Sequence, residues 1–293
     1  MNVIEIRNLT KNYGRSRGIR EINMEVEEGE IFGFIGPNGA GKSTTIRLLL
    51  NLIFPTSGHA RMLGLDVVKD AKAIKRDVGY VPSDANLYDR LTVGEFFRYC
   101  ADYFPGRVSA KRMTELSDTL ELDLGRKMEE LSLGNRKKVA IVQSLLHSPR
   151  LFILDEPTTG LDPLIQSRLF HLLRSENEKG TSIFFSSHIL SDVQTLCRRV
   201  AIIKDGKIIQ VEDIDSLRSR QLKKVTVRFD GAAVPESIPL DGASRISINE
   251  DREVRFVFSG AMNDLVRFLA GQNIKSLVVE DPSLEEIFMH YYQ

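Results

Sequence analysis

The clearest chemical signal in the sequence is a glycine-rich loop near the N-terminus. The segment Gly36–Thr44 fits the phosphate-loop pattern G-x-x-x-x-G-K-[ST]. Glycines allow the backbone to wrap a phosphate chain with its N–H groups pointing inward, and a helix N-terminus adds partial positive charge. The pattern therefore predicts a nucleoside triphosphate site built from Gly36, Pro37, Asn38, Gly39, Ala40, Gly41, Lys42, Ser43 and Thr44.

Two side chains of this loop have specific predicted roles. The Lys42 ammonium would reach the β- and γ-phosphates, and the Ser43 hydroxyl would bind Mg²⁺. The alternative is an ordinary glycine-rich turn with a nearby lysine. The loop stands, however, between an apolar stretch predicted as a buried strand, Ile31–Ile35, and a predicted helix over residues 45–53. Because nucleotide binding needs that strand–loop–helix order, the context favours it.

A pair of acids is the second chemical signal. Asp155 and Glu156 directly follow the apolar run Leu151–Leu154. An acidic residue at a strand end beside a phosphate loop is placed to meet the Mg²⁺. Asp155 is the predicted metal-side group, acting through a water, and Glu156 is predicted to orient or deprotonate the attacking water. Taken alone, the pair would fit a solvated strand end equally well.

His188 is the third candidate for catalysis. It follows Ser186 and Ser187, after the buried run Ser182–Phe185. Strand ends beside the phosphate loop are where α/β sheets place their ligand contacts. His188 is therefore predicted to donate to the γ-phosphate and to sense its loss, with a purely structural histidine as the alternative.

The elements that must position these residues alternate in type along the chain. Val3–Ile6 and Ile22–Val26 alternate apolar and polar residues, which predicts half-buried antiparallel strands. The pattern is helical from about 92 to 147 and again over 163–178, and Asp205-Gly206 indicates a hairpin. Continuous apolar runs predict parallel strands buried on both faces, at 31–35, 151–154 and 182–185.

The pattern changes after about residue 220. Short alternating strands, a short helix at Leu265–Leu269 and a last helix at Pro282–Tyr292 predict a small α+β domain over 220–293. Residues 1–219 then form the larger α/β domain. Two readings of the small domain stay open: a regulatory or dimer-stabilising domain, or merely a stabilising cap.

Composition limits the classes of function. The 40 basic and 40 acidic residues balance, so charge gives no support for nucleic-acid binding. The two cysteines, Cys100 and Cys197, have no metal-ligand spacing, which argues against a disulfide framework or a zinc site and fits a reducing cytoplasm. The apolar runs are far shorter than the roughly 20 residues that span a bilayer.

The order of the motifs resembles the nucleotide-binding subunit of ATP-binding cassette (ABC) transporters. Lys42 is followed by a helical insert, by Leu131-Ser132-Leu133-Gly134-Asn135, by the run Asp155–Asp162 and by His188. The segment from Leu131 to Asn135 lies where that family keeps its signature motif. The resemblance covers about residues 1–215.

The resemblance implies a P-loop NTPase core of ABC ATPase type, with an antiparallel β subdomain and a helical subdomain at about 84–147. It also implies ATP and Mg²⁺ as cofactors, and a head-to-tail dimer with a second copy or a homologous cassette. Ser132 and Gly134 of one chain would then contact the γ-phosphate held by the other chain. Free N–H groups and a hydroxyl at a helix start suit an anion, although Ser132 by itself is also a good N-cap.

Two further residues match family positions. Asp162 matches the dimer-contact loop, although an aspartate before Pro163 is also good N-cap chemistry. Tyr13 matches the aromatic residue that stacks on adenine, and a core or surface tyrosine is the alternative.

Two departures from the family pattern stand out. Ser83 occupies the place of a glutamine or glutamate that normally reaches Mg²⁺ and couples to the membrane subunit, and serine would need a bridging water. Asp84 is the alternative for that contact. In the signature, Leu133 replaces a usual glycine and Asn135 a usual glutamine. We therefore expect a working but slow ATPase.

The resemblance implies a cytoplasmic ATPase subunit, peripheral on the inner face of the cell membrane, that powers a separate permease. In the family, the segment Ser83–Tyr99 docks a permease helix, and Asp281–Phe288 resembles the tail of drug, antibiotic and peptide exporters. The alternative is a soluble ABC-type ATPase acting on DNA or the ribosome. Such relatives usually carry two cassettes, a long coiled coil or basic extensions, which the sequence does not show. A small-molecule kinase is disfavoured by the signature segment.

Overall fold

The architecture was obtained as a computed structural model, which describes residues 1–14, 16–84, 90–219, 223–230, 238–248 and 253–280. The chain divides into two compact units, Met1–Glu212 and Asp213–Gln293. The sequence placed this division at residue 220 instead. The difference is helix α8 (Ile214–Ser219), which belongs to the second unit.

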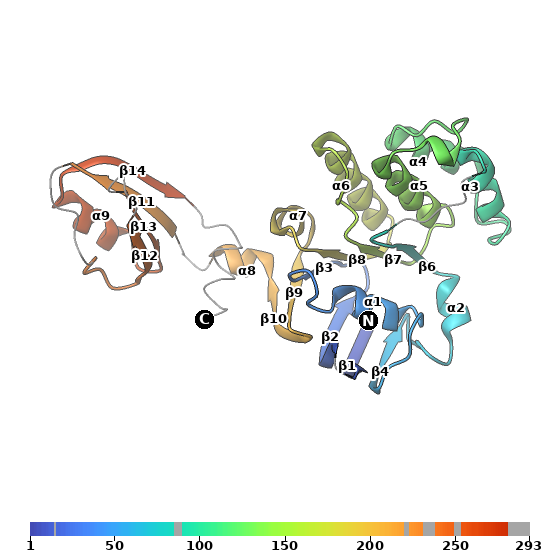
Figure 1. Cartoon of the computed structure of the whole chain (residues 1–293), viewed down its shortest axis with the longest axis horizontal. Coiled ribbons are helices and arrows are strands. Elements are labelled where there is room, and N and C mark those ends of the chain that lie inside the picture. The colour runs from blue at the N-terminus through green and yellow to red at the C-terminus, as the bar shows by residue number, and fades with distance from the viewer. Residues whose placement is uncertain (15, 85–89, 220–222, 231–237, 249–252, 281–293) are drawn as a thin grey trace. The chain divides into compact units, whose positions relative to one another are not determined.

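A six-stranded sheet forms the centre of the first unit (Figure 1). The strands lie in the order β10-β9-β3-β8-β7-β6, and every neighbouring pair from β9 to β6 is parallel. Every residue of β3, β7 and β8 is buried, as their continuous apolar runs predict. The strands span Ile31–Ile35 (β3), Val78–Val81 (β6), Leu151–Asp155 (β7), Ser182–Ser187 (β8), Arg199–Lys204 (β9) and Lys207–Asp213 (β10).

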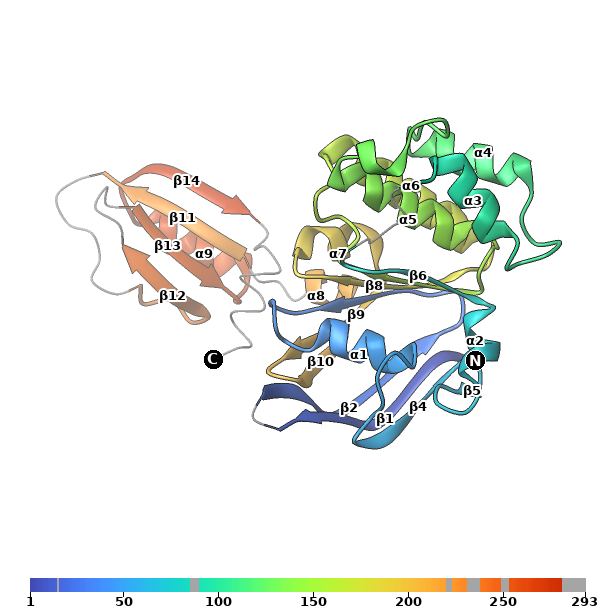
Figure 2. The same cartoon turned by 45° about the vertical axis from the view of Figure 1, so that its right-hand side comes forward.

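An antiparallel sheet forms the second layer of this unit, with the order β2-β1-β4-β5. Figure 2 shows helix α1 (Lys42–Leu49) between the two sheets, where it helps to close a shared apolar core. This sheet confirms the antiparallel strands predicted near the N-terminus, although they are longer than their apolar residues indicate. The strands span Asn2–Tyr13 (β1), Ser16–Glu27 (β2), Ser57–Met62 (β4) and Leu65–Asp66 (β5).

Helix α1 corrects the predicted helix over 45–53. It begins inside the phosphate loop at Lys42 and ends at Leu49, well before Pro55. Asn51 has the left-handed φ of 50°, the Leu52 N–H donates to the Arg47 carbonyl at 2.9 Å, and the Asn51 N–H donates to the Leu48 carbonyl at 3.1 Å. This is the Schellman arrangement, in which an Asn can take the place of glycine. The asparagine therefore ends the helix, and the proline does not.

The residues between β6 and β8 include helices that cover the other face of the six-stranded sheet. Figure 1 shows α3, α4, α5 and α6 on the side of the six-stranded sheet away from α1. Each of the four begins at a side-chain cap, provided in order by Thr92, Ser109, Ser132 and Asp162. The helices of this unit span Ala71–Lys75 (α2), Val93–Ala101 (α3), Ala110–Thr119 (α4), Met128–Glu130 (a 3₁₀ turn), Leu133–Leu145 (α5), Pro163–Glu178 (α6) and Leu190–Leu196 (α7).

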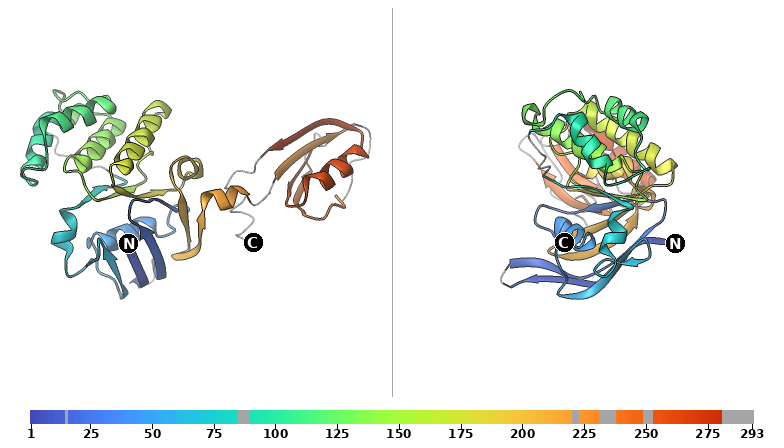
Figure 3. Two further views of the ribbon diagram at one scale, coloured as in Figure 1. Left: turned by 180° about the vertical axis from the view of Figure 1, so that it is seen from behind. Right: turned by 90° about the vertical axis from the view of Figure 1, so that its right-hand side faces the viewer.

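The second unit contains an antiparallel sheet with the order β12-β13-β11-β14. Figure 3 shows α9 (Met262–Ala270) covering one face of it, and Val225, Phe256 and Leu265 lie in the core between them. The four strands span Lys223–Phe229 (β11), Ala243–Ile248 (β12), Glu253–Phe258 (β13) and Ile274–Glu280 (β14). The predicted helix Pro282–Tyr292 lies outside the described residues. Across the part of the chain that the structure describes, no helix has the length and apolarity that a membrane crossing requires.

Candidate nucleotide site

The phosphate loop connects β3 to α1 and lines a cavity of about 400 Å³. Two of its glycines are required by the local geometry. Gly41 has a φ of 115°, and a Cβ on Gly36 would lie 2.2 Å from the Ile203 carbonyl oxygen. The cavity is lined by Gly18, Asn38, Gly39, Gly41, Lys42, Ser43, Thr44, Ser83 and Glu156.

Three residues of the predicted site accept hydrogen bonds at their backbone carbonyl oxygens. Gly36 and Pro37 supply carbonyl oxygens, and Ala40 is 3% exposed with its carbonyl accepting from the Gly206 N–H at 3.0 Å. Gly206 belongs to the predicted hairpin, so the turn between β9 and β10 supports the loop.

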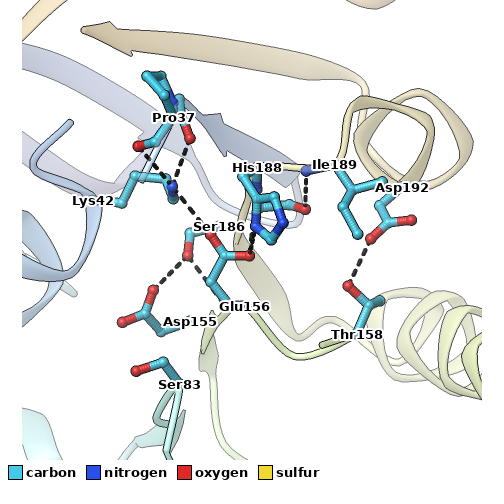
Figure 4. Close-up of polar contacts among 12 residues, drawn as sticks. Pro37, Lys42, Ser83, Asp155, Glu156, Thr158, Ser186, His188, Ile189 and Asp192 are labelled. Atoms are coloured by element: carbon cyan, nitrogen blue, oxygen red, sulfur yellow. Dashed lines mark hydrogen bonds and ion pairs between the residues drawn. The ribbon is translucent and has the colours of Figure 1, made fainter. Parts of the chain in front are cut away.

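Lys42 is buried, and its ammonium contacts other groups at the phosphate cavity (Figure 4). Its Nζ donates to the carbonyl oxygens of Gly36 at 2.6 Å and Pro37 at 3.3 Å, and it lies 3.1 Å from Glu156 Oε1. A buried ammonium needs such partners. Any phosphate entering the cavity must therefore compete with the Glu156 carboxylate for this lysine.

Glu156 is held by two groups on its two carboxylate oxygens. Oε1 faces Lys42, while Oε2 lies 2.6 Å from His188 Nδ1. Its backbone is left-handed, with φ 53°, which is strained for a glutamate and typical of functional sites. The sequence order brought Lys42, Glu156 and His188 into one hypothesis, and the fold brings their side chains into contact.

Asp155 ends strand β7 and is 1% exposed. Its Oδ1 accepts a hydrogen bond from the Ser186 hydroxyl at 2.8 Å, and Ser186 lies beside it on β8. The Glu156 N–H donates to the same Ser186, at its carbonyl, over 3.2 Å. Ser186 thus fixes both acids, although the sequence indicated only the histidine two residues later.

Lys137 is a second buried ammonium near the site. It lies on α5, is 4% exposed, and donates to the carbonyl oxygens of Pro82 at 3.0 Å and Ser83 at 2.6 Å. Burial lowers its pKa, and the negative charges of Asp155, Asp84 and Glu156 oppose that shift. The sequence did not single it out, because a lysine within a helix carries no local signal of burial.

A third polar pair joins the segments that follow Glu156 and His188. The Thr158 hydroxyl donates to Asp192 Oδ2 at 2.6 Å, and both residues are buried (Figure 4). Burial raises the Asp192 pKa, and the hydrogen bond from Thr158 partly offsets this. The pair therefore holds the two catalytic segments in a fixed relation.

The predicted signature residues lie at the start of α5. The Ser132 hydroxyl accepts from the Asn135 N–H at 3.3 Å, and a Cβ on Gly134 would lie 2.8 Å from the Gly160 carbonyl oxygen. Leu133, the departure from the family pattern, is 67% exposed. Neither Ser132 nor Gly134 is one of the described residues that line the phosphate cavity.

Asp162 and Tyr13 also lie outside that lining. Asp162 caps α6 by accepting from the Ile165 N–H at 3.0 Å, which is the N-cap chemistry considered as the alternative to a dimer contact. Tyr13 lies at the end of β1 and is 44% exposed, with the Lys11 ammonium 5.3 Å from its ring centroid.

Comparison with known proteins identifies the family. Residues 19–159 match the family model described as ABC transporter. The bacitracin transport ATP-binding protein BcrA of Bacillus licheniformis is 37% identical over 227 residues, which cover 75% of this chain and 73% of BcrA. The chain belongs to the ABC transporter family. Its predicted resemblance to the ATP-binding subunits of drug and antibiotic exporters is confirmed.

A second relative extends over both units of this ABC subunit. The linearmycin resistance ATP-binding protein LnrL of Bacillus subtilis is 29% identical over 303 aligned positions, covering 98% of this chain and 97% of LnrL. The match therefore includes the C-terminal unit, which the family model does not reach.

Solved structures confirm the predicted ABC ATPase fold. An ATP-binding subunit of an ABC transporter has a TM-score of 0.68 and 30% identity, covering 74% of this chain and 92% of that one. The cassette MJ0796, solved as a dimer in a post-hydrolysis state with ADP and Pi, has a TM-score of 0.66 and 27% identity, covering 72% and 98%. This ABC subunit is therefore an ATPase that binds ATP, as predicted.

Proposed function

We propose that this subunit closes on ATP as a head-to-tail pair and drives a separate integral-membrane permease that exports drugs, antibiotics or peptides. One observation carries the proposal. The described lining of the cavity includes Lys42 and Glu156 but not Ser132, which caps α5 elsewhere on the same unit. A helix start with free N–H groups suits a phosphate, so a second copy or a homologous cassette can supply it.

Two comparisons support the pairing of cassettes and the role in transport. MJ0796 forms a dimeric cassette, and BcrA is named for bacitracin transport. A subunit of this kind would work at the inner face of the cell membrane, bound to its permease. Asp162 would contact the second chain, and Tyr13 would stack on adenine.

The contacts of Glu156 indicate how hydrolysis would start. Lys42 lies within 3.1 Å of Glu156 Oε1, so a γ-phosphate that captures the lysine releases this oxygen. The free oxygen can then orient water and accept its proton, while His188 keeps Oε2 in place at 2.6 Å. His188, which is partly exposed, would also donate to the γ-phosphate.

The residues present fit Mg²⁺ as the companion of ATP. The Ser43 hydroxyl lines the cavity, and Asp155 supplies a carboxylate at the end of the neighbouring strand. Hydroxyl and carboxylate oxygens are the ligands Mg²⁺ prefers, and it usually keeps several waters and phosphate oxygens as well. Bound Mg²⁺ would neutralise charge on the phosphates.

A mixing experiment tests the shared site. Lys42→Ala and Ser132→Arg chains should each be inactive alone, because every site of either dimer carries one defect. In a mixed head-to-tail dimer, one site carries both defects and the other carries none. The mixture should recover ATPase activity, at most about a quarter of normal, because half of the dimers are mixed and each has one intact site. A mixture as inactive as its components would contradict the head-to-tail arrangement.

Glu156→Gln tests the role of the base. It should bind ATP normally, lose hydrolysis by on the order of 10²- to 10³-fold, and accumulate as an ATP-bound dimer. Size-exclusion chromatography with and without ATP measures the dimer, and phosphate release measures turnover. Normal steady-state turnover would rule out Glu156 as the base.

Affinity purification tests the membrane partner. The tagged chain, extracted with detergent from membranes of its own cells, should retain a polytopic membrane protein. Those cells should also accumulate more labelled antibiotic or peptide when Glu156→Gln replaces the normal chain. Recovery of a ribosome or DNA in place of a membrane protein would overturn this part of the proposal.

A further inference from the structure

Lys137 connects helix α5 to the segment that carries Ser83, a residue of the phosphate cavity. Its ammonium donates to the carbonyl oxygens of Pro82 and Ser83, at 3.0 and 2.6 Å. Ser83 is also one of the residues that line the phosphate cavity, together with Lys42 and Glu156. Lys137 itself belongs to α5, the helix that Ser132 caps.

A second side chain of α5 makes a similar contact. The Ser144 hydroxyl donates to the Tyr80 carbonyl at 2.6 Å, near the end of β6. Helix α5 is thus hydrogen-bonded to Tyr80, Pro82 and Ser83, all on the segment that leads into the cavity wall. A helix fixed at several points along one segment moves with it as a rigid element.

We propose that Lys137 is a positioning residue. It couples Ser83, which lines the nucleotide site of the same chain, to the start of α5, where Ser132 is the N-cap. The coupling of two ATP sites rests on the proposed head-to-tail dimer, in which Ser132 serves the second chain. ATP that displaces Ser83 on one chain then moves the helix that contacts ATP on the other.

The burial of Lys137 makes this contact strong. The side chain is 4% exposed, so its ammonium has little water to replace the two carbonyls. The acids Asp155 and Glu156, at the end of β7, add attraction from the catalytic side.

Lys137→Met tests the coupling, because methionine keeps the apolar stem and removes the donors. We expect kcat to fall by about tenfold with KM for ATP changed less than about threefold, since the base and phosphate loop are intact. The dependence of the rate on ATP concentration should also lose its steepness, with the Hill coefficient falling towards one. Amide exchange of Tyr80, Val81, Ser83 and Asp84 should become faster. Lys137→Arg, which keeps the charge and the donors, should restore part of each property.

Lys138→Met is the matched control. Lys138 is the next residue of α5 and is 8% exposed, and among the described residues it has no hydrogen bond to Pro82 or Ser83. Its variant should keep the normal kcat and Hill coefficient. Thermal unfolding of each variant separates loss of coupling from loss of fold, and Lys137→Gln replaces the methionine variant if that one unfolds.

The outcomes separate this inference from the proposed function. If Glu156→Gln fails to form an ATP-dependent dimer, the head-to-tail proposal is wrong. If that dimer forms but Lys137→Met retains normal kcat, cooperativity and amide exchange, the coupling role alone is wrong. Equal losses in Lys137→Met and Lys138→Met would also overturn it, since they would reflect general damage to α5.

Discussion

The two units of this ABC subunit differ in where their charged side chains lie. In the first unit, Lys42, Asp155 and Lys137 are each 5% exposed or less and are held at the carboxyl end of the six-stranded sheet. In the second unit, the ion pairs of the described residues lie at the surface or are partly exposed, and the core is apolar; they include Arg255–Glu253, Arg267–Asp264 and Lys224–Glu280.

This difference separates catalysis from stability. Burying a charged group costs folding free energy unless the group is fully partnered. The first unit therefore holds buried charges that reduce its stability but can serve catalysis. Surface pairs contribute little, and apolar burial stabilises the second unit. Substitutions should therefore mainly affect activity in the first site and mainly affect folding in the second core.

The largest expected effect is loss of ATP hydrolysis in Lys42→Ala. The alanine removes the cation from the cavity and leaves the Glu156 carboxylate without its ammonium partner. We expect hydrolysis to fall by on the order of 10³-fold and nucleotide binding to be lost. A fluorescent nucleotide and a phosphate-release assay measure the two effects. Lys111→Ala, at an 84% exposed position on α4, is the control and should be unchanged; equal losses in both variants would contradict a specific role.

Phe256→Ala should produce the opposite result. Phe256 lies on β13, is 2% exposed, and belongs to the core of the second unit. Its truncation should destabilise that unit by about 3–5 kcal/mol, because it leaves a cavity. Urea unfolding followed by probes in each unit measures the change, and ATPase activity at low temperature should stay within about twofold of normal. A large loss of hydrolysis without unfolding would show that the two units are not functionally separate.

A smaller effect concerns pH and His147 of the first unit. His147 is 3% exposed and stacks on Phe104, with ring centroids 4.0 Å apart; burial and the charge of Arg107 lower its pKa to about 4. An unfolded histidine has a pKa of about 6.5 and binds a proton below it that the folded chain excludes. The stability due to this group is therefore complete above that pKa and is lost as the pH falls towards about 4.

His147→Phe should remove this dependence while keeping the stacked ring. Between about pH 7 and about pH 5, the normal chain should lose about 2 kcal/mol of unfolding free energy through this histidine, and the variant should not. Urea unfolding of the first unit at the two pH values measures the difference. His171→Phe, at an exposed position of α6, should retain the normal pH dependence. If both variants behave like the normal chain, burial of His147 does not control acid stability.

Much of the fold could be predicted from the sequence because its signals are local. The buried strands carry unbroken apolar runs, and α6 begins at an Asp-Pro pair that caps it. Strand β4 was missed, since only Ala60 and Met62 of its residues are buried. Its pairing with β1, and not its own pattern, makes it a strand. The end of α1 was misplaced because the left-handed Asn51 is a weaker sequence signal than Pro55.

The sequence by itself determined that this chain binds and hydrolyses ATP, because the phosphate loop, the paired acids and the signature occur in a diagnostic order. The tertiary structure decided how the groups are shared. Only parallel packing of β3, β7 and β8 brings Lys42, Glu156 and His188 within contact of one another. Likewise, only packing of α5 beside β6 turns Lys137 from an ordinary helix residue into a buried donor to Ser83. Hydrogen bonds and ion pairs act over a few ångströms, so spacing along the chain cannot specify them.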